Sequence, residues 1–278
     1  MEQNKSLIVF QDKSIRRTWY NNEWWFLIED VIQVLIDSND PKSYISKMKI
    51  RDEELSKGWG QIVRTLPIIT SGGAQNMNCA NTEGVFRIIQ SITSPKAEPF
   101  KLWLAKVGYE RVKEIENPEL AQKRMKETYI AKGYSEDWIE KRIRGIAVRD
   151  ELTDEWKKRN VKEEKEFAIL TAEISKATFG MTPKEYQKFK GLNQENLRDH
   201  MNDLELIFSM LGERVSTEIT REENSQGYPE VEKAAKRGGK VAGNARKETE
   251  KELGRPITSN ENYLDTSEKE KRKQITKK

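Results

Sequence analysis

The N-terminal part of the chain is defined most clearly by one stretch, WWFLIEDVIQVL, at residues 24–35. Its first half is aromatic and aliphatic, which is typical of a buried strand. Its second half has apolar residues at helical spacing after the acidic pair Glu29-Asp30. The preceding pair Asn21-Asn22 can adopt positive φ angles, so it predicts a tight turn between strands at 15–20 and 24–28. We therefore expect a β-hairpin that leads directly into a helix.

The same mixture of strands and helices continues to Asn117-Pro118, a step that favours an extended backbone and a domain boundary. The other elements expected before it are strands at 7–10, 62–69 and 75–80, and helices that begin near Val31, Pro41, Thr82 and Pro95. This pattern predicts a small mixed α/β domain at residues 1–117.

The pattern after Pro118 is wholly helical. Ser135 is expected to cap one helix, and Thr182-Pro183-Lys184-Glu185 forms a capping box with proline at the first helical position. A further helix is expected to start at Asn193 and to stop at Gly212. The apolar faces of these helices must be buried against one another, which predicts an all-α domain at 118–227 and an α+β protein as a whole.

Residues 228–278 contain 14 Lys and Arg against 9 Asp and Glu and few large apolar side chains. Such a composition is typical of a solvated segment, and we expect a flexible basic tail there. Whether this tail contacts nucleic acid is left open by its sequence.

Several classes of function find no support in the composition. Cys79 is the only cysteine and His200 the only histidine of the 278 residues, so neither a disulfide nor a cysteine-based zinc site can form within the chain. We expect Cys79 to be a small buried group and His200 to lie on a helix surface. No catalytic residue, metal or cofactor is expected, because a nuclease needs a convergent acid cluster that the sequence does not define.

The start of the chain lacks the apolar core of a signal peptide, and no apolar run approaches the roughly 20 residues that span a bilayer. We therefore expect a cytoplasmic protein that has no membrane partner.

Basic side chains of the first domain are the candidates for binding DNA. Lys42 and Lys49 are seven residues apart and share one face of the short helix that begins at Pro41, whereas Arg16 and Arg17 point to opposite faces of a strand. The alternative is that these cations are ordinary solvated charges. The full candidate set is Arg16, Arg17, Lys42, Lys47, Lys49, Arg51, Arg87, Lys96 and Lys101.

Three segments of the first domain resemble the BRO-type N-terminal domain of baculovirus repeated-ORF proteins and phage antirepressors. They are WWFLIEDVIQVL (24–35), NTEGVFRIIQSI (81–92) and SPKAEPFKLWLAKV (94–107). This resemblance implies a DNA-binding N-terminal domain and no defined reaction.

Four later segments resemble the DNA damage-inducible protein D family. They are RIRGIAVRDELTDEWKKR (142–159), KEFAILTAEISKATFGMTPKEYQKFKG (165–191), NLRDHMNDLELIFSMLGE (196–213) and KRGGKVAGNARKE (236–248). This resemblance implies a bacterial protein linked to the DNA-damage (SOS) response. The alternative is a protein-interaction module that docks on a recombination or repair protein. The type of DNA and the oligomeric state stay open.

Overall fold

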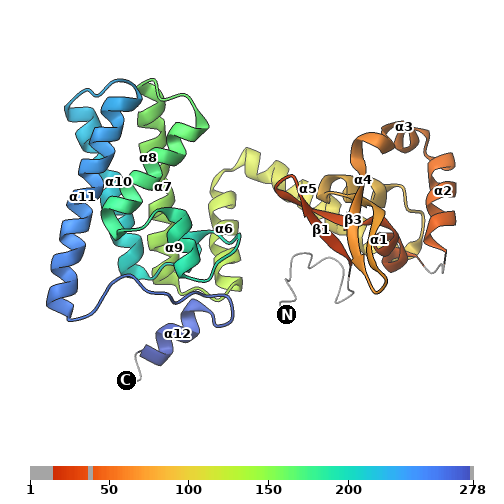
Figure 1. The fold of residues 1–278 in the computed structure, drawn as a ribbon. Coiled ribbons are helices and arrows are strands. Elements are labelled where there is room, and N and C mark those ends of the chain that lie inside the picture. Colours follow the sequence, from red (N-terminus) through yellow and green to blue (C-terminus); the bar gives the residue numbers. More distant parts are fainter. Residues whose placement is uncertain (1–14, 37–39, 276–278) are drawn as a thin grey trace. The chain divides into compact units, whose positions relative to one another are not determined.

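The computed structural model describes residues 15–36 and 40–275, and its contacts divide the chain into two units, Met1–Pro118 and Glu119–Lys278 (Figure 1). Each unit is described by itself below. A small antiparallel sheet with its helices is followed by a helical region, so the expected α+β class is confirmed. The strand expected at residues 7–10 lies outside the described residues.

The N-terminal unit contains a four-stranded antiparallel sheet in the order β1-β2-β4-β3. Its strands are β1 (Arg17–Tyr20), β2 (Glu23–Leu27), β3 (Val63–Thr70) and β4 (Gly73–Ala80). Asn21 and Asn22 turn the first hairpin with φ angles of 52° and 63°, and Tyr20 pairs with Glu23 across it. The expected asparagine turn is confirmed, because two positive φ angles match the right-handed twist of the flanking strands.

Helices pack beside this sheet and extend the unit to residue 116. They are α1 (Ile28–Leu35), α2 (Pro41–Arg51), α3 (Glu53–Ile62), α4 (Thr82–Gln90), the 3-10 turn η2 (Pro95–Ala97) and α5 (Glu98–Glu116). Helix α3 is not predicted from the sequence, because its glycines at 58 and 60 disfavour a helix. The Asp52 side chain nevertheless accepts a hydrogen bond from the Leu55 N–H and caps this helix.

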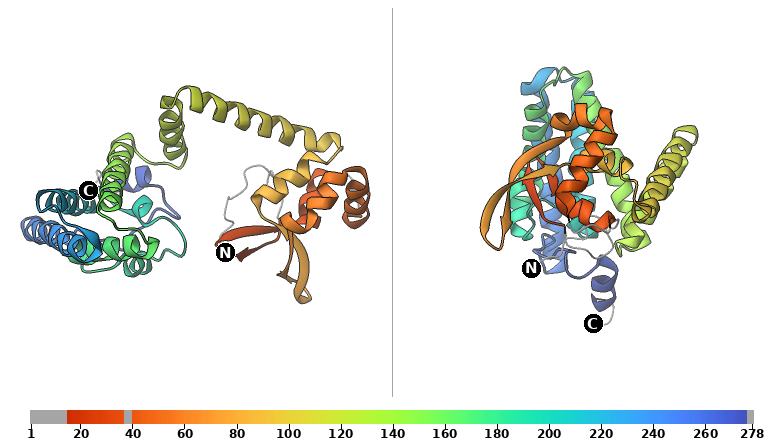
Figure 2. Two further views of the ribbon diagram at one scale, coloured as in Figure 1. Left: turned by 90° about the horizontal axis from the view of Figure 1, so that it is seen from above. Right: turned by 90° about the vertical axis from the view of Figure 1, so that its right-hand side faces the viewer.

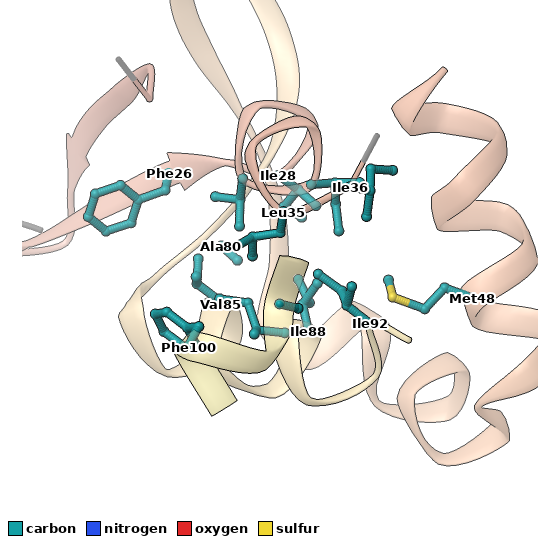
Figure 3. Packing of buried hydrophobic residues seen from close by; sticks show 14 of the residues in the cluster. Phe26, Ile28, Leu35, Ile36, Met48, Ala80, Val85, Ile88, Ile92 and Phe100 are labelled. Atoms are coloured by element: carbon teal, nitrogen blue, oxygen red, sulfur yellow. The ribbon is translucent and has the colours of Figure 1, made fainter. Parts of the chain in front are cut away.

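The core of the N-terminal unit lies between β2, α1, α4 and the beginning of α5. Figure 3 shows Val85 and Ile88 of α4 turned toward Ile28 and Leu35 of α1, with Phe100 of α5 beside them. Since burial of apolar surface is the main favourable term in folding, this cluster fixes how the sheet sits against the helices.

The helical unit is built around four long helices, α7, α8, α10 and α11, which lie side by side (Figures 1 and 2). Its elements are α6 (Glu119–Ala131), α7 (Glu136–Lys158), α8 (Glu164–Phe179), α9 (Pro183–Phe189), the 3-10 turn η3 (Leu197–His200), α10 (Asp203–Glu222), α11 (Gly227–Leu253) and α12 (Glu268–Ile275). The caps predicted at Ser135 and at Thr182 with Glu185 are confirmed. No helix of the described residues is long and apolar enough to cross a membrane.

The helix expected from Asn193 to Gly212 is wrong in both limits. A 3-10 turn occupies 197–200, and Asn202 with Glu205 forms a capping box that starts α10 afresh. Gly212 lies inside α10, where a Cβ would come within 2.8 Å of the Thr178 hydroxyl oxygen. This glycine therefore permits close packing of α10 on α8 and does not end a helix.

The expectation of a flexible tail from residue 228 is also wrong. Helix α11 buries Ala235, Gly238 and Gly239 against α8 and α10. A Cβ on Gly238 would lie 2.5 Å from the Ser216 backbone nitrogen, so the helices approach closely because this position has no side chain. A count of large apolar residues misses such packing, since small residues supply the contact surface.

The segment after α11 is held in place as well. The buried Lys190 ammonium donates hydrogen bonds to the carbonyl oxygens of Ser259 and Glu261 at 2.8 and 3.0 Å, and to the Glu205 carboxylate at 3.0 Å. Ile257 is buried in the same core as Trp138. These contacts make residues 254–263 part of the helical unit.

The glycine packing can be tested by substitution. Gly238→Ala should lower the free energy of unfolding of the helical unit by about 1–3 kcal/mol, because its methyl group collides with the Ser216 backbone. Gly108→Ala in α5 is the control, since no atom lies within 4 Å of that Cβ. It should leave stability unchanged or raise it by up to ~1 kcal/mol. Urea denaturation followed by circular dichroism measures both, and equal effects would contradict this account of the packing.

The corrected unit boundary predicts which fragment folds. Residues 119–278 should unfold cooperatively on heating, whereas residues 118–227 should not, because they lack α11, the helix that packs on both α8 and α10. Calorimetry of the two fragments checks this. A cooperative transition of the shorter fragment would show that α11 is dispensable for the fold.

Candidate nucleic-acid interface

A groove of about 480 Å³ in the N-terminal unit collects polar and basic side chains from three elements and the start of α1. We call it the α2–β4 groove. Its lining consists of Ile28, Glu29, Lys42, Ile45, Ser46, Lys49, Trp59, Gln75, Asn76, Met77 and Asn78.

Helix α2 supplies the cations of the groove. Its start is fixed by Pro41 at the first position and by Asp40, whose carboxylate accepts a hydrogen bond from the Ser43 N–H at 3.0 Å. Lys42 and Lys49 both line the groove, whereas Met48 points into the core. The face that these two lysines were predicted to share is therefore the face of a real depression in the surface.

Both lysines have partners that hold them loosely. The Lys42 ammonium lies 3.8 Å from Glu29, and its side chain remains 76% exposed. The Lys49 ammonium lies 4.9 Å from the centre of the Trp59 ring, a cation–π contact. Exposed pairs of this kind contribute only about 0–1 kcal/mol, so either lysine can exchange its partner for an incoming anion.

Strand β4 supplies the opposite wall, where Asn76 and Asn78 share one face of the strand and Gln75 alternates to the other. The Thr65 hydroxyl on β3 donates to the Asn78 side-chain oxygen at 3.1 Å, which orients that amide. Amide groups carry both donors and acceptors, the combination that recognises base edges. These residues and Trp59 are absent from the predicted set, although the run QNMN in a predicted strand is a visible signal.

The hairpin arginines stabilise the fold of the unit. Arg16 forms a two-pronged ion pair with Asp30 at 2.9 and 2.7 Å, and this hydrogen bonding raises the pKa of its guanidinium. The Arg17 guanidinium lies 4.0 Å from the centre of the Trp24 ring, and burial there lowers its pKa. Neither side chain lines the α2–β4 groove.

Arg51 and Arg87 lie at the junction of α2, α3 and α4. Arg87 donates to both carboxylate oxygens of Asp52 at 3.1 and 3.2 Å, and Arg51 donates to the Ser91 carbonyl at 3.0 Å. Hydrogen bonds from the Ser91 hydroxyl, the Leu55 N–H and Arg87 lower the pKa of Asp52 to about 2. Both arginines therefore hold neighbouring elements together.

The remaining candidates are dispersed. Lys47 is exposed on α2, Lys96 is exposed in η2, and Lys101 is half-buried on α5. None of them lines the groove. Of the nine predicted residues, the structure thus brings Lys42 and Lys49 together in one depression.

The single cysteine and the single histidine of the chain, Cys79 and His200, are both buried. Cys79 is confirmed as a buried group in β4, and burial raises the pKa of its thiol to about 11. The expected surface position of His200 is wrong, because it is only 7% exposed in η3 and its Nδ1 accepts a hydrogen bond from the Tyr263 N–H. Within residues 15–36 and 40–275, no group of three or more His, Cys, Asp or Glu side chains is placed to hold a metal.

A family model matches the part of the chain that contains this groove. Residues 14–112 match the BRO family, N-terminal domain. The match spans the whole sheet, helices α1–α4 and most of α5, so it includes every residue of the groove. No curated protein matches the chain. The BRO resemblance of the first domain is therefore supported, and that of the later segments to DNA damage-inducible protein D stays a prediction.

The Asp52 junction makes the stability of the N-terminal unit depend on pH. The pKa of Asp52 is lowered from 3.8 to about 2, so the folded state favours its charged form. The resulting stabilisation is complete above pH 3.8 and is lost as the pH falls through 2. The difference in unfolding free energy between wild type and Asp52→Asn should therefore shrink from pH 4 to pH 2. Urea denaturation measures it, with Glu54→Gln on the same helix as the control. A constant difference would rule out this linkage.

Proposed function

We propose that this chain is a non-enzymatic DNA-binding regulator of the phage-antirepressor type, which contacts DNA through the α2–β4 groove. The observation that carries this proposal is the meeting of two lysines with the amides of Asn76 and Asn78 in one groove, within the residues that match the BRO N-terminal domain.

Lys42 and Lys49 would neutralise phosphates, which adds affinity without sequence preference. Asn76 and Asn78 would contact base edges and supply preference for a sequence. Glu29 lies 3.8 Å from the Lys42 ammonium, so a phosphate that binds Lys42 would replace this carboxylate as its partner.

The finer biological role rests on the resemblance of the helical segments to DNA damage-inducible protein D. We further propose that this chain is a cytoplasmic protein of the bacterial DNA-damage response. The rival reading, in which the helical unit docks on a recombination or repair protein, predicts binding that salt affects little, because an apolar helix interface does not release counterions.

Removal of the groove lysines tests the phosphate contacts. Lys42→Ala and Lys49→Ala should each weaken binding to all DNA sequences alike and lower the slope of log K against log salt by about 1. Lys57→Ala is the matched control, because Lys57 is an exposed lysine of the same unit that pairs with Glu53 and Glu54 outside the groove. Fluorescence anisotropy with single- and double-stranded probes at four salt concentrations gives the slopes. An unchanged slope in the double variant would refute the assignment.

Removal of the amides tests the base contacts separately. Asn76→Ala should reduce discrimination at one base position by ~1–3 kcal/mol and leave the salt slope unchanged. Competition between probes that differ at single positions measures this preference. A uniform loss of affinity would instead make Asn76 a phosphate or structural contact.

A further inference from the structure

Helix α11 runs along the outside of the helical unit and carries its positive charge on one side (Figure 1). Val231, Ala235, Gly239 and Ala242 are buried on its inner side, so the opposite side faces solvent. Six of the seven Lys and Arg side chains of the helix lie on that exposed side. We call these six the α11 basic face, which consists of Lys233, Lys236, Arg237, Lys240, Lys247 and Lys251.

A row of three lysines forms the centre of this face. Lys233, Lys240 and Lys247 recur every seven residues, which is close to two helical turns, so they point in nearly the same direction. The row is about 21 Å long, since each residue advances the helix by about 1.5 Å. All five glutamates of α11 lie about a quarter of a turn or more away from it. No carboxylate of the helix therefore interrupts the row.

The cations beside the row have partners, whereas those of the row do not. Lys236 lies 2.9 Å from Glu232, and Arg237 donates a hydrogen bond to Glu223 of α10. For the three lysines of the row, the described part of the chain offers no carboxylate at ion-pair distance. These three exposed ammonium groups are therefore available to an external anion.

The spacing of these lysines indicates a long and regular polyanion. Neighbours in the row are about 10 Å apart along the helix, so a single small anion would contact only one of them. Duplex DNA carries one negative charge per about 1.7 Å of its axis, and a stretch as long as the row presents phosphates to all three lysines.

The uncharged side chains of α11 disfavour other anionic partners. Its exposed large apolar residues, Val241 and Leu253, both point away from the row. An acidic protein or an anionic membrane would gain much of its affinity from apolar anchors, which this face lacks. No aromatic side chain of residues 227–253 lies on the face either, so unpaired bases find no surface for stacking. The face therefore fits the backbone of a duplex best.

We propose that the α11 basic face binds the phosphate backbone of duplex DNA without sequence preference. Lys233, Lys240 and Lys247 each contact a phosphate, and Arg237 adds positive charge beside them. Cations that the composition places in a flexible tail thus act from the surface of a folded helix. This face belongs to the helical unit and the α2–β4 groove to the N-terminal unit, so either proposal can fail without the other.

Removal of the row in the full chain tests the proposal. Lys233→Gln/Lys240→Gln/Lys247→Gln should weaken binding to a random-sequence duplex of about 20 base pairs by roughly tenfold or more at about 0.1 M salt. The slope of log K against log salt should fall by about 2.7, because each lost phosphate contact lowers it by about 0.9. Fluorescence anisotropy at several salt concentrations measures both. Glutamine keeps a high helix propensity, so the circular dichroism spectrum and the melting temperature should not change.

A matched variant separates local contacts from net charge. Lys158→Gln/Lys184→Gln/Lys188→Gln also removes three exposed lysines of the helical unit for which the described residues offer no ion-pair partner. These lysines lie on α7 and α9 and form no such row. This variant should bind the duplex with nearly the slope of the wild type.

Two results would overturn the proposal. One is a row variant that keeps the affinity and slope of the wild type, or that loses no more than the matched variant. The other is a row variant that loses binding only to a poly-glutamate peptide or to vesicles of anionic lipid, because the face would then serve an acidic chain or a membrane. The groove variant Lys42→Ala/Lys49→Ala distinguishes the two DNA proposals. If it leaves the slope unchanged while the row variant lowers it, the groove proposal alone is refuted.

Discussion

The geometry of the N-terminal unit depends on the carboxylate of Asp52. This residue follows the last residue of α2 and caps α3, while Arg87 and the Ser91 hydroxyl hold it from the α4 side. The corner between α2 and α3 is thereby fixed, which sets Lys49 opposite Trp59 at 4.9 Å. A charge-assisted hydrogen bond is stronger than a neutral one, and here a single acceptor fixes three elements. The α2–β4 groove exists because these elements meet at this angle.

The helical unit depends on a different constraint, the close approach of helix backbones. Gly238 and Gly239 on α11 face Ser216 and Ile174, and a Cβ at either position would meet backbone atoms at less than 3 Å. Short distances between helices gain many dispersion contacts without large side chains. The segment beyond α11 is then held by the Lys190 ammonium, whose burial is tolerable because a carboxylate and two carbonyl oxygens surround it.

Local signals in the sequence were sufficient wherever one residue type dictates the backbone. Asn21-Asn22 and the Thr182 capping box are such cases, and both were placed correctly. Features that depend on tertiary contacts were missed. The start of α10 is an exception, because the capping box Asn202–Glu205 is a local signal that Asn193 lacks, so this boundary could be predicted from the sequence. Lys42 and Lys49 could be paired from their spacing, whereas the wall of amides from β4 could not, because it requires the path of the sheet.

If the α2–β4 groove binds DNA as proposed, its lysines and its amides have different roles. Lys42 and Lys49 would attract any polyanion, which raises both the rate of encounter and the affinity. Phosphates recur at regular intervals whatever the sequence, so these lysines alone would not distinguish one DNA site from another. Base edges differ in their donors and acceptors, and the side-chain amides of Asn76 and Asn78 offer both. Under the proposal, sequence preference therefore resides in the uncharged wall of the groove that β4 supplies.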